Sequence, residues 1–126
     1  MSRRTLLIVE DESDLRQMYR VVLSLAGFEV TEAADGLEAL RRIDGWAPPD
    51  LIILDLGMPI LSGHAVAQEV AAREDLRHIP VLIVTASEEE LDHLDAACVL
   101  RKPVSPDDLI RAVHRCLDSA SSRAKR

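Results

Sequence analysis

The segment Leu51-Ile52-Ile53-Leu54-Asp55 places four consecutive branched aliphatic residues directly before an acidic one. Three other apolar runs also end at polar residues: residues 6–9 before Glu10-Asp11, 81–84 before Thr85, and 98–101 before Lys102-Pro103. Runs without polar alternation are typical of parallel strands that are buried on both faces. Because the carboxyl ends of parallel strands meet at one edge of a sheet, we expect three carboxylates, a hydroxyl and an ammonium to converge there.

Segments with helical periodicity separate these runs. The first helix is predicted to begin with Ser13 as its cap and to end at Gly27, and the second covers about residues 36–43. A third contains Ala65 and Val66, a short fourth spans about 88–96, and a fifth opens with Ser105 as cap and Pro106 in its first turn. Residues 28–32 alternate apolar and polar, which is typical of an edge strand.

This alternation predicts an α/β fold with three layers. Five βα units form a doubly wound parallel sheet with right-handed crossovers, and the flavodoxin-like strand order 2-1-3-4-5 brings Glu10-Asp11 beside Asp55. We expect one domain over residues 1–118. Residues 119–126 lack an apolar anchor and are expected to form a disordered basic tail.

The composition narrows the classes of function. The 126 residues carry a formal net charge of −7 and only 2% aromatics, which disfavours direct nucleic-acid binding. Cys98 and Cys116 lack metal-ligand spacing and are interpreted as reduced structural thiols. The first apolar run is too short for a signal peptide, and no later run approaches a membrane span. A cytoplasmic location without membrane insertion is therefore expected.

The predicted cluster at the sheet edge has a definite chemistry. Three carboxylates at Glu10, Asp11 and Asp55 repel one another, and a Mg²⁺ site is the good reason to gather them, because this ion takes carboxylate and carbonyl oxygens together with waters. Lys102 offers a compact positive charge to a phosphoryl oxygen, and Thr85 a hydroxyl donor. One carboxylate could then act as a nucleophile toward phosphorus.

At these positions the sequence resembles the receiver domain of two-component response regulators, of the chemotaxis-regulator type. The resemblance covers about residues 5–117. Four motifs carry it: Val9-Glu10-Asp11-Glu12, Asp55-Leu56-Gly57-Met58-Pro59 with Gly63 four residues later, Thr85-Ala86, and Lys102-Pro103. Each motif alone is weak, but their order at the ends of successive strands is specific.

The resemblance implies a role for each matching residue. Asp55 would be the phosphoacceptor, and Mg²⁺ would be bound by the carboxylates of Asp11 and Asp55, the carbonyl of Gly57 and, through water, Glu10. Contacts to the phosphoryl group would come from Lys102 and Thr85. The family also implies a cis peptide bond before Pro103 and a third helix that opens at Gly63.

The chain departs from the family at two points. The family usually has an aromatic residue three positions before the lysine, where this chain has Val99, and that residue takes part in switching. The spacing from Thr85 to Lys102 is also shorter than usual, which implies a shortened fourth helix. Ser87 and Gly57 occupy positions where the family tunes hydrolysis. Because both are small, we expect water to reach the acyl phosphate, which should turn over.

The leading hypothesis is a phosphorylation-controlled binding module. A histidine kinase or phosphotransfer protein would phosphorylate Asp55 and so switch contacts with an unknown downstream protein, in a stand-alone regulator or a fragment of a longer one. A weak homodimer is left open, and no separate enzymatic activity is expected beyond catalysis of its own phosphorylation and dephosphorylation.

Two alternatives belong to other classes. Val99 and the short fourth helix motivate a degenerate receiver that binds partners constitutively. An aspartyl-phosphate phosphatase would typically carry a second aspartate two residues after the nucleophile, where this chain has Gly57, so the sequence disfavours it.

Overall fold

The computed structural model describes residues 3–45, 47–58, 61–86 and 98–124. Its strands and helices follow one another in this order: β1 (Thr5–Val9), α1 (Ser13–Leu25), β2 (Glu29–Ala33), α2 (Gly36–Gly45), β3 (Leu51–Asp55), α3 (Gly63–Ala72), β4 (Val81–Thr85), β5 (Cys98–Arg101) and α4 (Pro106–Ala124).

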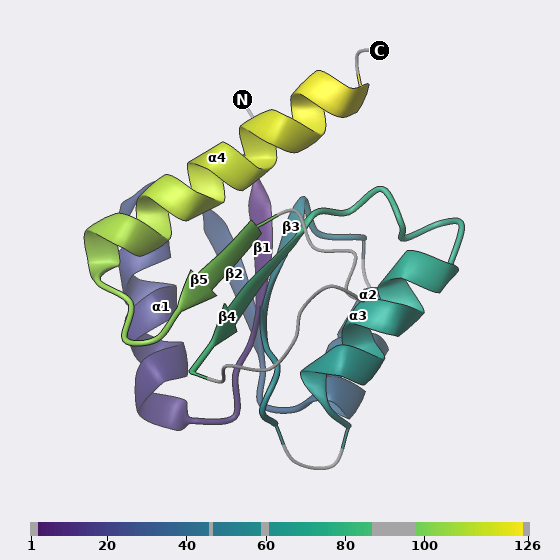
Figure 1. The fold of residues 1–126 in the computed structure, drawn as a ribbon, viewed down its shortest axis with the longest axis horizontal. Helices are drawn as coiled ribbons and strands as arrows, with labels where there is room; N and C mark the ends of the chain where they lie inside the picture. Colours follow the sequence, from purple (N-terminus) through teal and green to yellow (C-terminus); the bar gives the residue numbers. More distant parts are fainter. Residues whose placement is uncertain (1–2, 46, 59–60, 87–97, 125–126) are drawn as a thin grey trace.

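The five strands form one parallel sheet in the order β2-β1-β3-β4-β5. Helices α1 and α4 cover one face and α2 and α3 the other (Figure 1). The predicted three-layer α/β fold and its flavodoxin-like strand order are therefore confirmed. All carboxyl ends of the strands lie at one edge of this sheet, opposite the edge from which β1 starts.

The core has two halves, one on each face of the sheet. Leu7, Ile52 and their neighbours pack under α2 and α3, whereas Leu6 and Ile53 pack under α1 and α4. This division follows from the alternation of side chains along a strand. Strands β3 and β4 are buried along their whole length, as predicted, and each buried aliphatic side chain contributes roughly 1.5–3 kcal/mol.

Strand β5 differs from the prediction. Its residues alternate between partly buried and exposed, and the side chain of Val99 is 40% exposed. The prediction of a strand buried on both faces was wrong here because β5 is an edge strand, hydrogen-bonded to β4 only among the described strands. The predicted edge position of β2 is confirmed.

The ends of α1 correct one prediction and confirm another. Glu12, not Ser13, is the N-cap, and no side chain caps this end, because the first helical hydrogen bond runs from the Arg16 N–H to the Glu12 carbonyl. Gly27, with φ of 101°, ends the helix. The Phe28 N–H donates to the Leu23 carbonyl, the bond that closes a Schellman motif.

The last helix is longer than expected. Ser105 caps α4 through a hydrogen bond from the Asp108 N–H to its hydroxyl (3.1 Å), as predicted. The helix continues to Ala124, so it includes residues 119–124, which were expected to lie beyond the helix. No glycine or proline follows Pro106 in the sequence, so nothing in the backbone chemistry ends the helix earlier.

Some expectations fall on other parts of the chain. The short fourth helix predicted at about 88–96, and Ser87, lie outside the described residues. In the part of the chain that the structure describes, no helix combines the length and apolar character needed to cross a membrane.

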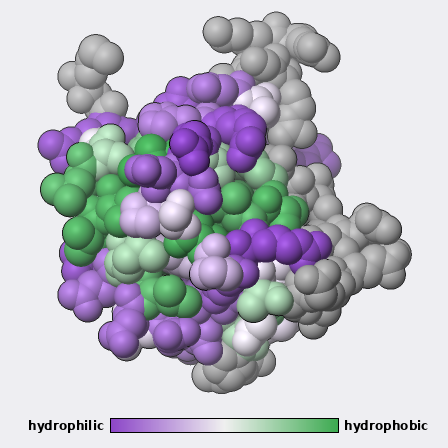
Figure 2. Space-filling model, turned by 60° about the vertical axis from the view of Figure 1, so that its left-hand side comes forward, coloured by the Kyte–Doolittle hydropathy of each residue, from purple (hydrophilic) through white to green (hydrophobic). Residues whose placement is uncertain are grey.

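Large apolar side chains are exposed on α1. Val21 and Leu25, which is 84% exposed, lie one turn apart on this helix. Figure 2 shows the side of the molecule on which α1 lies, where hydrophobic residues form a band between hydrophilic ones.

Candidate functional site

The carboxyl ends of four strands supply the side chains that the sequence singled out. Asp55 and Thr85 are the last residues of β3 and β4, whereas Glu10 and Lys102 directly follow β1 and β5. The strand register pairs Val9 with Leu54 and Asp55 with Val84. Because these strands are neighbours with matched ends, the four polar side chains meet at one edge.

Three carboxylates gather at this edge. Glu10, Asp11 and Asp55 each offer an oxygen, and these oxygens all lie within 4.8 Å of one another. The side chains differ in burial, because Glu10 is 2% exposed and Asp55 7%, whereas Asp11 is exposed. Two buried acids beside an exposed one form a site that is open to solvent on one side.

Lys102 provides the positive charge in this cluster. Its Nζ lies 2.8 Å from Glu10 Oε1 and 3.7 Å from Asp55 Oδ2. Burial disfavours the charged ammonium, but the hydrogen bond and charge of Glu10 and the charge of Asp55 outweigh it and raise the pKa of Lys102. The amine therefore stays protonated between the two carboxylates.

Both oxygens of Glu10 are engaged. Oε1 accepts from Lys102, and Oε2 accepts from the Glu12 N–H at 3.2 Å. Burial nevertheless raises the pKa of Glu10 to about 7, although the hydrogen bonds from Lys102 and Glu12 lower it. The desolvation penalty of the charged carboxylate is larger than the stabilisation that these hydrogen bonds provide.

The backbone around Asp55 is tightly constrained. The Gly57 N–H donates to Asp55 Oδ1 at 3.2 Å. The Gly63 N–H donates to the Leu56 carbonyl at 3.2 Å, and a Cβ on Gly63 would lie 2.2 Å from the Asp55 carbonyl oxygen. Helix α3 begins at Gly63, as the resemblance implied, so the start of this helix is held against the end of β3.

The end of β5 is fixed to β4 in a similar way. The Lys102 N–H donates to the Thr85 carbonyl at 2.9 Å, and the Lys102–Pro103 peptide bond is cis, as expected. The side chain of Thr85 is buried. Val99 lies on β5, three residues before Lys102, and is not part of the carboxylate cluster. The position of Ser87 lies outside the described residues.

Among the described residues, Arg16 contacts this cluster although the sequence pattern did not indicate it. The Arg16 guanidinium donates from Nη1 to the carbonyl oxygen of Glu10 at 2.8 Å. Arg16 lies in α1, and a basic residue at this distance after the acidic pair was the only signal in the sequence. That signal is weak, because many exposed helix faces carry arginine.

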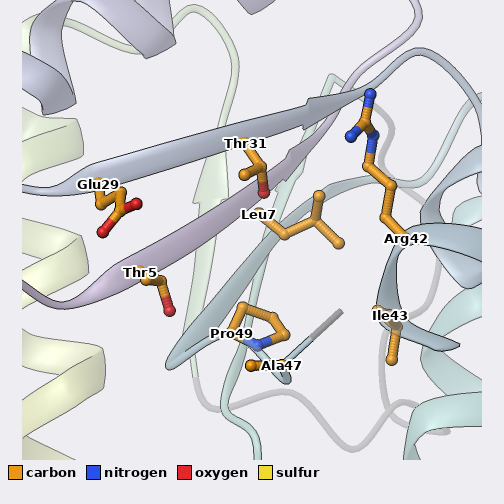
Figure 3. A pocket seen from close by; sticks show the side chains of 8 residues that line it. All are labelled: Thr5, Leu7, Glu29, Thr31, Arg42, Ile43, Ala47 and Pro49. Carbon is orange, nitrogen blue, oxygen red and sulfur yellow. The ribbon is translucent and has the colours of Figure 1, made fainter. Parts of the chain in front are cut away.

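A separate pocket lies at the other end of the sheet. Thr5 and Leu7 of β1, Glu29 of β2 and Arg42 of α2 help to line it. Figure 3 shows Glu29 and Arg42 at its two ends, with Leu7 between them. The pocket adjoins the amino ends of the strands and is therefore distinct from the carboxylate cluster.

The residues of the cluster fit a divalent cation of the hard type. Mg²⁺ prefers a few carboxylate oxygens and completes its shell with carbonyl oxygens and waters. Oxygens from three carboxylates within 4.8 Å, one of them on an exposed residue, provide such a donor set. Lys102 would balance part of the remaining negative charge.

Comparisons with known proteins agree with this geometry. A "Probable transcriptional regulator ycf27" of Porphyridium aerugineum is 38% identical over 97% of this chain and 52% of its own length. The "Sensory transduction protein RegX3" of Mycobacterium tuberculosis is 36% identical over 90% of this chain and 50% of its own. The chain thus spans about half the length of these curated relatives.

Solved structures give the same result. The chemotaxis protein CheY4 of Vibrio cholerae superimposes with a TM-score of 0.84 at 30% identity, over 91% of this chain and 99% of that one. Residues 6–114 match the family described as the response regulator receiver domain. Phosphorylation and Mg²⁺ binding are typical of that family. The match extends over most of the chain and over all five strands, so this protein belongs to the response regulator receiver domain family.

Proposed function

We propose that Asp55 accepts a phosphoryl group from a histidine kinase or a phosphotransfer protein. The observation that carries this proposal is the position of Lys102, whose Nζ lies 2.8 Å from Glu10 and 3.7 Å from Asp55 beside three converging carboxylates. Asp11, Asp55 and the Gly57 carbonyl would hold Mg²⁺, with Glu10 acting through water.

The proposed chemistry uses the groups of this edge directly. One carboxylate oxygen of Asp55 forms a bond to phosphorus while the bond to the donor's nitrogen breaks, and the donor imidazole leaves with that electron pair. Mg²⁺ held by Asp11, Asp55 and the Gly57 carbonyl would supply positive charge to the phosphoryl oxygens. Lys102 pairs with one of these oxygens and Thr85 donates its hydroxyl to another. Small residues at Gly57 and Ser87 would let water hydrolyse the acyl phosphate.

The output would be a change in protein–protein contacts. Relatives named as transcriptional regulators support a role in regulating transcription, in a cytoplasmic signalling pathway. The downstream partner would be another protein or another part of a longer chain, and a weak homodimer is one form that this contact could take.

Intact mass spectrometry tests the phosphoacceptor. After incubation with acetyl phosphate and Mg²⁺, we expect a gain of about 80 Da, the mass of one phosphoryl group. The gain should be absent in Asp55→Asn and in samples with EDTA. The exposed Asp14→Asn is the matched control and should retain it. A gain that persists in Asp55→Asn would refute Asp55 as the acceptor.

A constitutive binding module is the second candidate. It is favoured by Val99, an aliphatic residue that is 40% exposed on the edge strand β5 where the family usually has a switching aromatic residue. Beryllofluoride, which mimics the phosphoryl group on aspartate, separates the two candidates. Amide shifts in β5 and α4 that change on its addition support switching. Changes confined to the carboxylate cluster would favour the constitutive module.

A further inference from the structure

Arg16 connects three elements at the edge of the sheet. It lies in α1, its Nη1 donates to the Glu10 carbonyl oxygen at 2.8 Å, and its Nε pairs with Glu32 Oε1 of β2 at 3.4 Å. The side chain of Arg16 is only 20% exposed. This guanidinium therefore touches the end of β1 from α1 while a carboxylate on β2 holds it in place.

The contact falls on the peptide that joins two of the clustered acids. The Glu10 N–H still belongs to the sheet, because it donates to the Ala33 carbonyl at 3.1 Å. The Glu10 carbonyl receives its hydrogen bond from Arg16 instead. The N–H and the carbonyl group of Glu10 are therefore both held by hydrogen bonds. Together they fix the plane of the peptide bond between Glu10 and Asp11.

Asp11 depends on this peptide more than the other two acids do. Its side chain is exposed, whereas those of Glu10 and Asp55 are buried and hold hydrogen bonds from Lys102 or Gly57. An exposed carboxylate keeps its direction mainly through its backbone. A peptide plane that is free to rotate would move the Asp11 oxygen out of the cluster.

We propose that Arg16 is a positioning residue for the metal site, which it serves by fixing the Glu10–Asp11 peptide with Glu32 as its anchor. This inference rests on the proposed Mg²⁺ site. Partners of this kind orient ligands without touching the ion, and their loss typically weakens metal binding about tenfold or more.

Arg20 offers a matched control. It pairs with the other oxygen of the same carboxylate, from Nε to Glu32 Oε2 at 3.1 Å, whereas the hydrogen bond to the Glu10 carbonyl comes from Arg16. Arg20→Ala therefore removes one arginine charge and one ion pair with Glu32, but leaves the hydrogen bond to the Glu10 carbonyl. Arg16→Ala removes both kinds of contact.

The test measures Mn²⁺ binding by electron paramagnetic resonance of the free ion, well below the unfolding temperature of every variant. We expect Arg16→Ala to raise the dissociation constant about tenfold, Arg16→Lys to recover part of this loss, and Arg20→Ala to change it less than about threefold. In metal-free protein, the ¹³C shift of the Glu10 carbonyl should move in Arg16→Ala and stay in Arg20→Ala.

Each other result counts against a specific claim. If the wild-type protein binds Mn²⁺ and Arg16→Ala binds it equally well, the positioning role is overturned while the metal site stands. If Arg16→Ala and Arg20→Ala weaken Mn²⁺ binding equally, the loss of one positive charge explains both results. That outcome also overturns the positioning role of Arg16. If the wild-type protein binds no Mn²⁺, the metal site itself fails and the positioning role fails with it.

Discussion

Gly63 determines how closely α3 approaches the end of β3. A Cβ at this position would meet the Asp55 carbonyl oxygen at 2.2 Å and the Leu56 Cα at 2.6 Å. Both obstacles are backbone atoms that cannot rotate away. Glycine is required here for its small size, because a larger residue would keep the first turn of α3 from lying against Asp55, the proposed phosphoacceptor.

Gly63→Ala should lower the free energy of unfolding by about 2–3 kcal/mol, the cost of overpacking a rigid site. Urea denaturation measures it. Gly45→Ala is the control, because a Cβ there meets nothing within 4 Å. At the end of α2 this change should be neutral or stabilise by up to about 1 kcal/mol. Equal losses in both variants would contradict the steric argument.

At the scale of residues, the sequence indicated the acids, the lysine and the threonine because each follows an apolar run. It did not indicate Arg16, whose partner is a backbone carbonyl. Backbone acceptors are the same in every residue, so a pattern of side chains cannot predict which carbonyl an arginine reaches.

The C-terminal end of α4 is a boundary that the hydrophobic pattern of the sequence did not predict. Its apolar face ends near Cys116 and Leu117, the last buried residues of the described chain, yet the helix continues to Ala124. Burial periodicity identifies the packed part of a helix only. Beyond it, backbone hydrogen bonds continue until a residue or a cap ends them, so we propose that the cooperative domain ends near residue 118.

A chain that ends after Asp118 should therefore unfold with a free energy within about 0.5 kcal/mol of the full chain, while its helical circular dichroism falls. Ending after Arg115 is the control. It removes Cys116 and Leu117, which are 0% and 4% exposed, and should cost several kcal/mol, about as much as truncating a large core side chain. A large loss in the first variant would place the domain boundary further along the chain.

In the whole molecule, the packing of strands and helices buries the Glu10 carboxyl group, which is exposed to water in the unfolded chain. Glu10 follows β1, and its side chain is 2% exposed because neighbouring strands and Lys102 surround it. Burial raises its pKa from 4.5 to about 7, against the hydrogen bond from Lys102. The folded protein thus holds a proton between these pH values that the unfolded chain releases.

Stability should consequently fall as pH rises from 5 to 8 in the absence of divalent cations. The Glu10 contribution is present below the unfolded pKa of 4.5 and is lost as pH rises through about 7, on the order of 3 kcal/mol in total. Glu10→Gln cannot titrate, so its unfolding free energy relative to wild type should rise across this range.

Urea denaturation at pH 5, 6, 7 and 8 measures this difference. Glu29→Gln, at an exposed residue of β2, is the control and should differ from wild type by the same amount at each pH. A Glu10→Gln difference that does not change with pH would show that Glu10 is ionised in the folded protein throughout.

The sequence by itself determined the strands and the acids at the sheet edge, because buried parallel strands require uninterrupted apolar runs and each of these acids stands at or just after the end of such a run. Tertiary structure alone decided the exposure of β5, the burial of Glu10 and the contact of Arg16 with the Glu10 carbonyl. Each of these depends on which neighbour lies beside a residue in space. A local pattern describes one element, whereas burial and long-range hydrogen bonds arise only when several elements pack together.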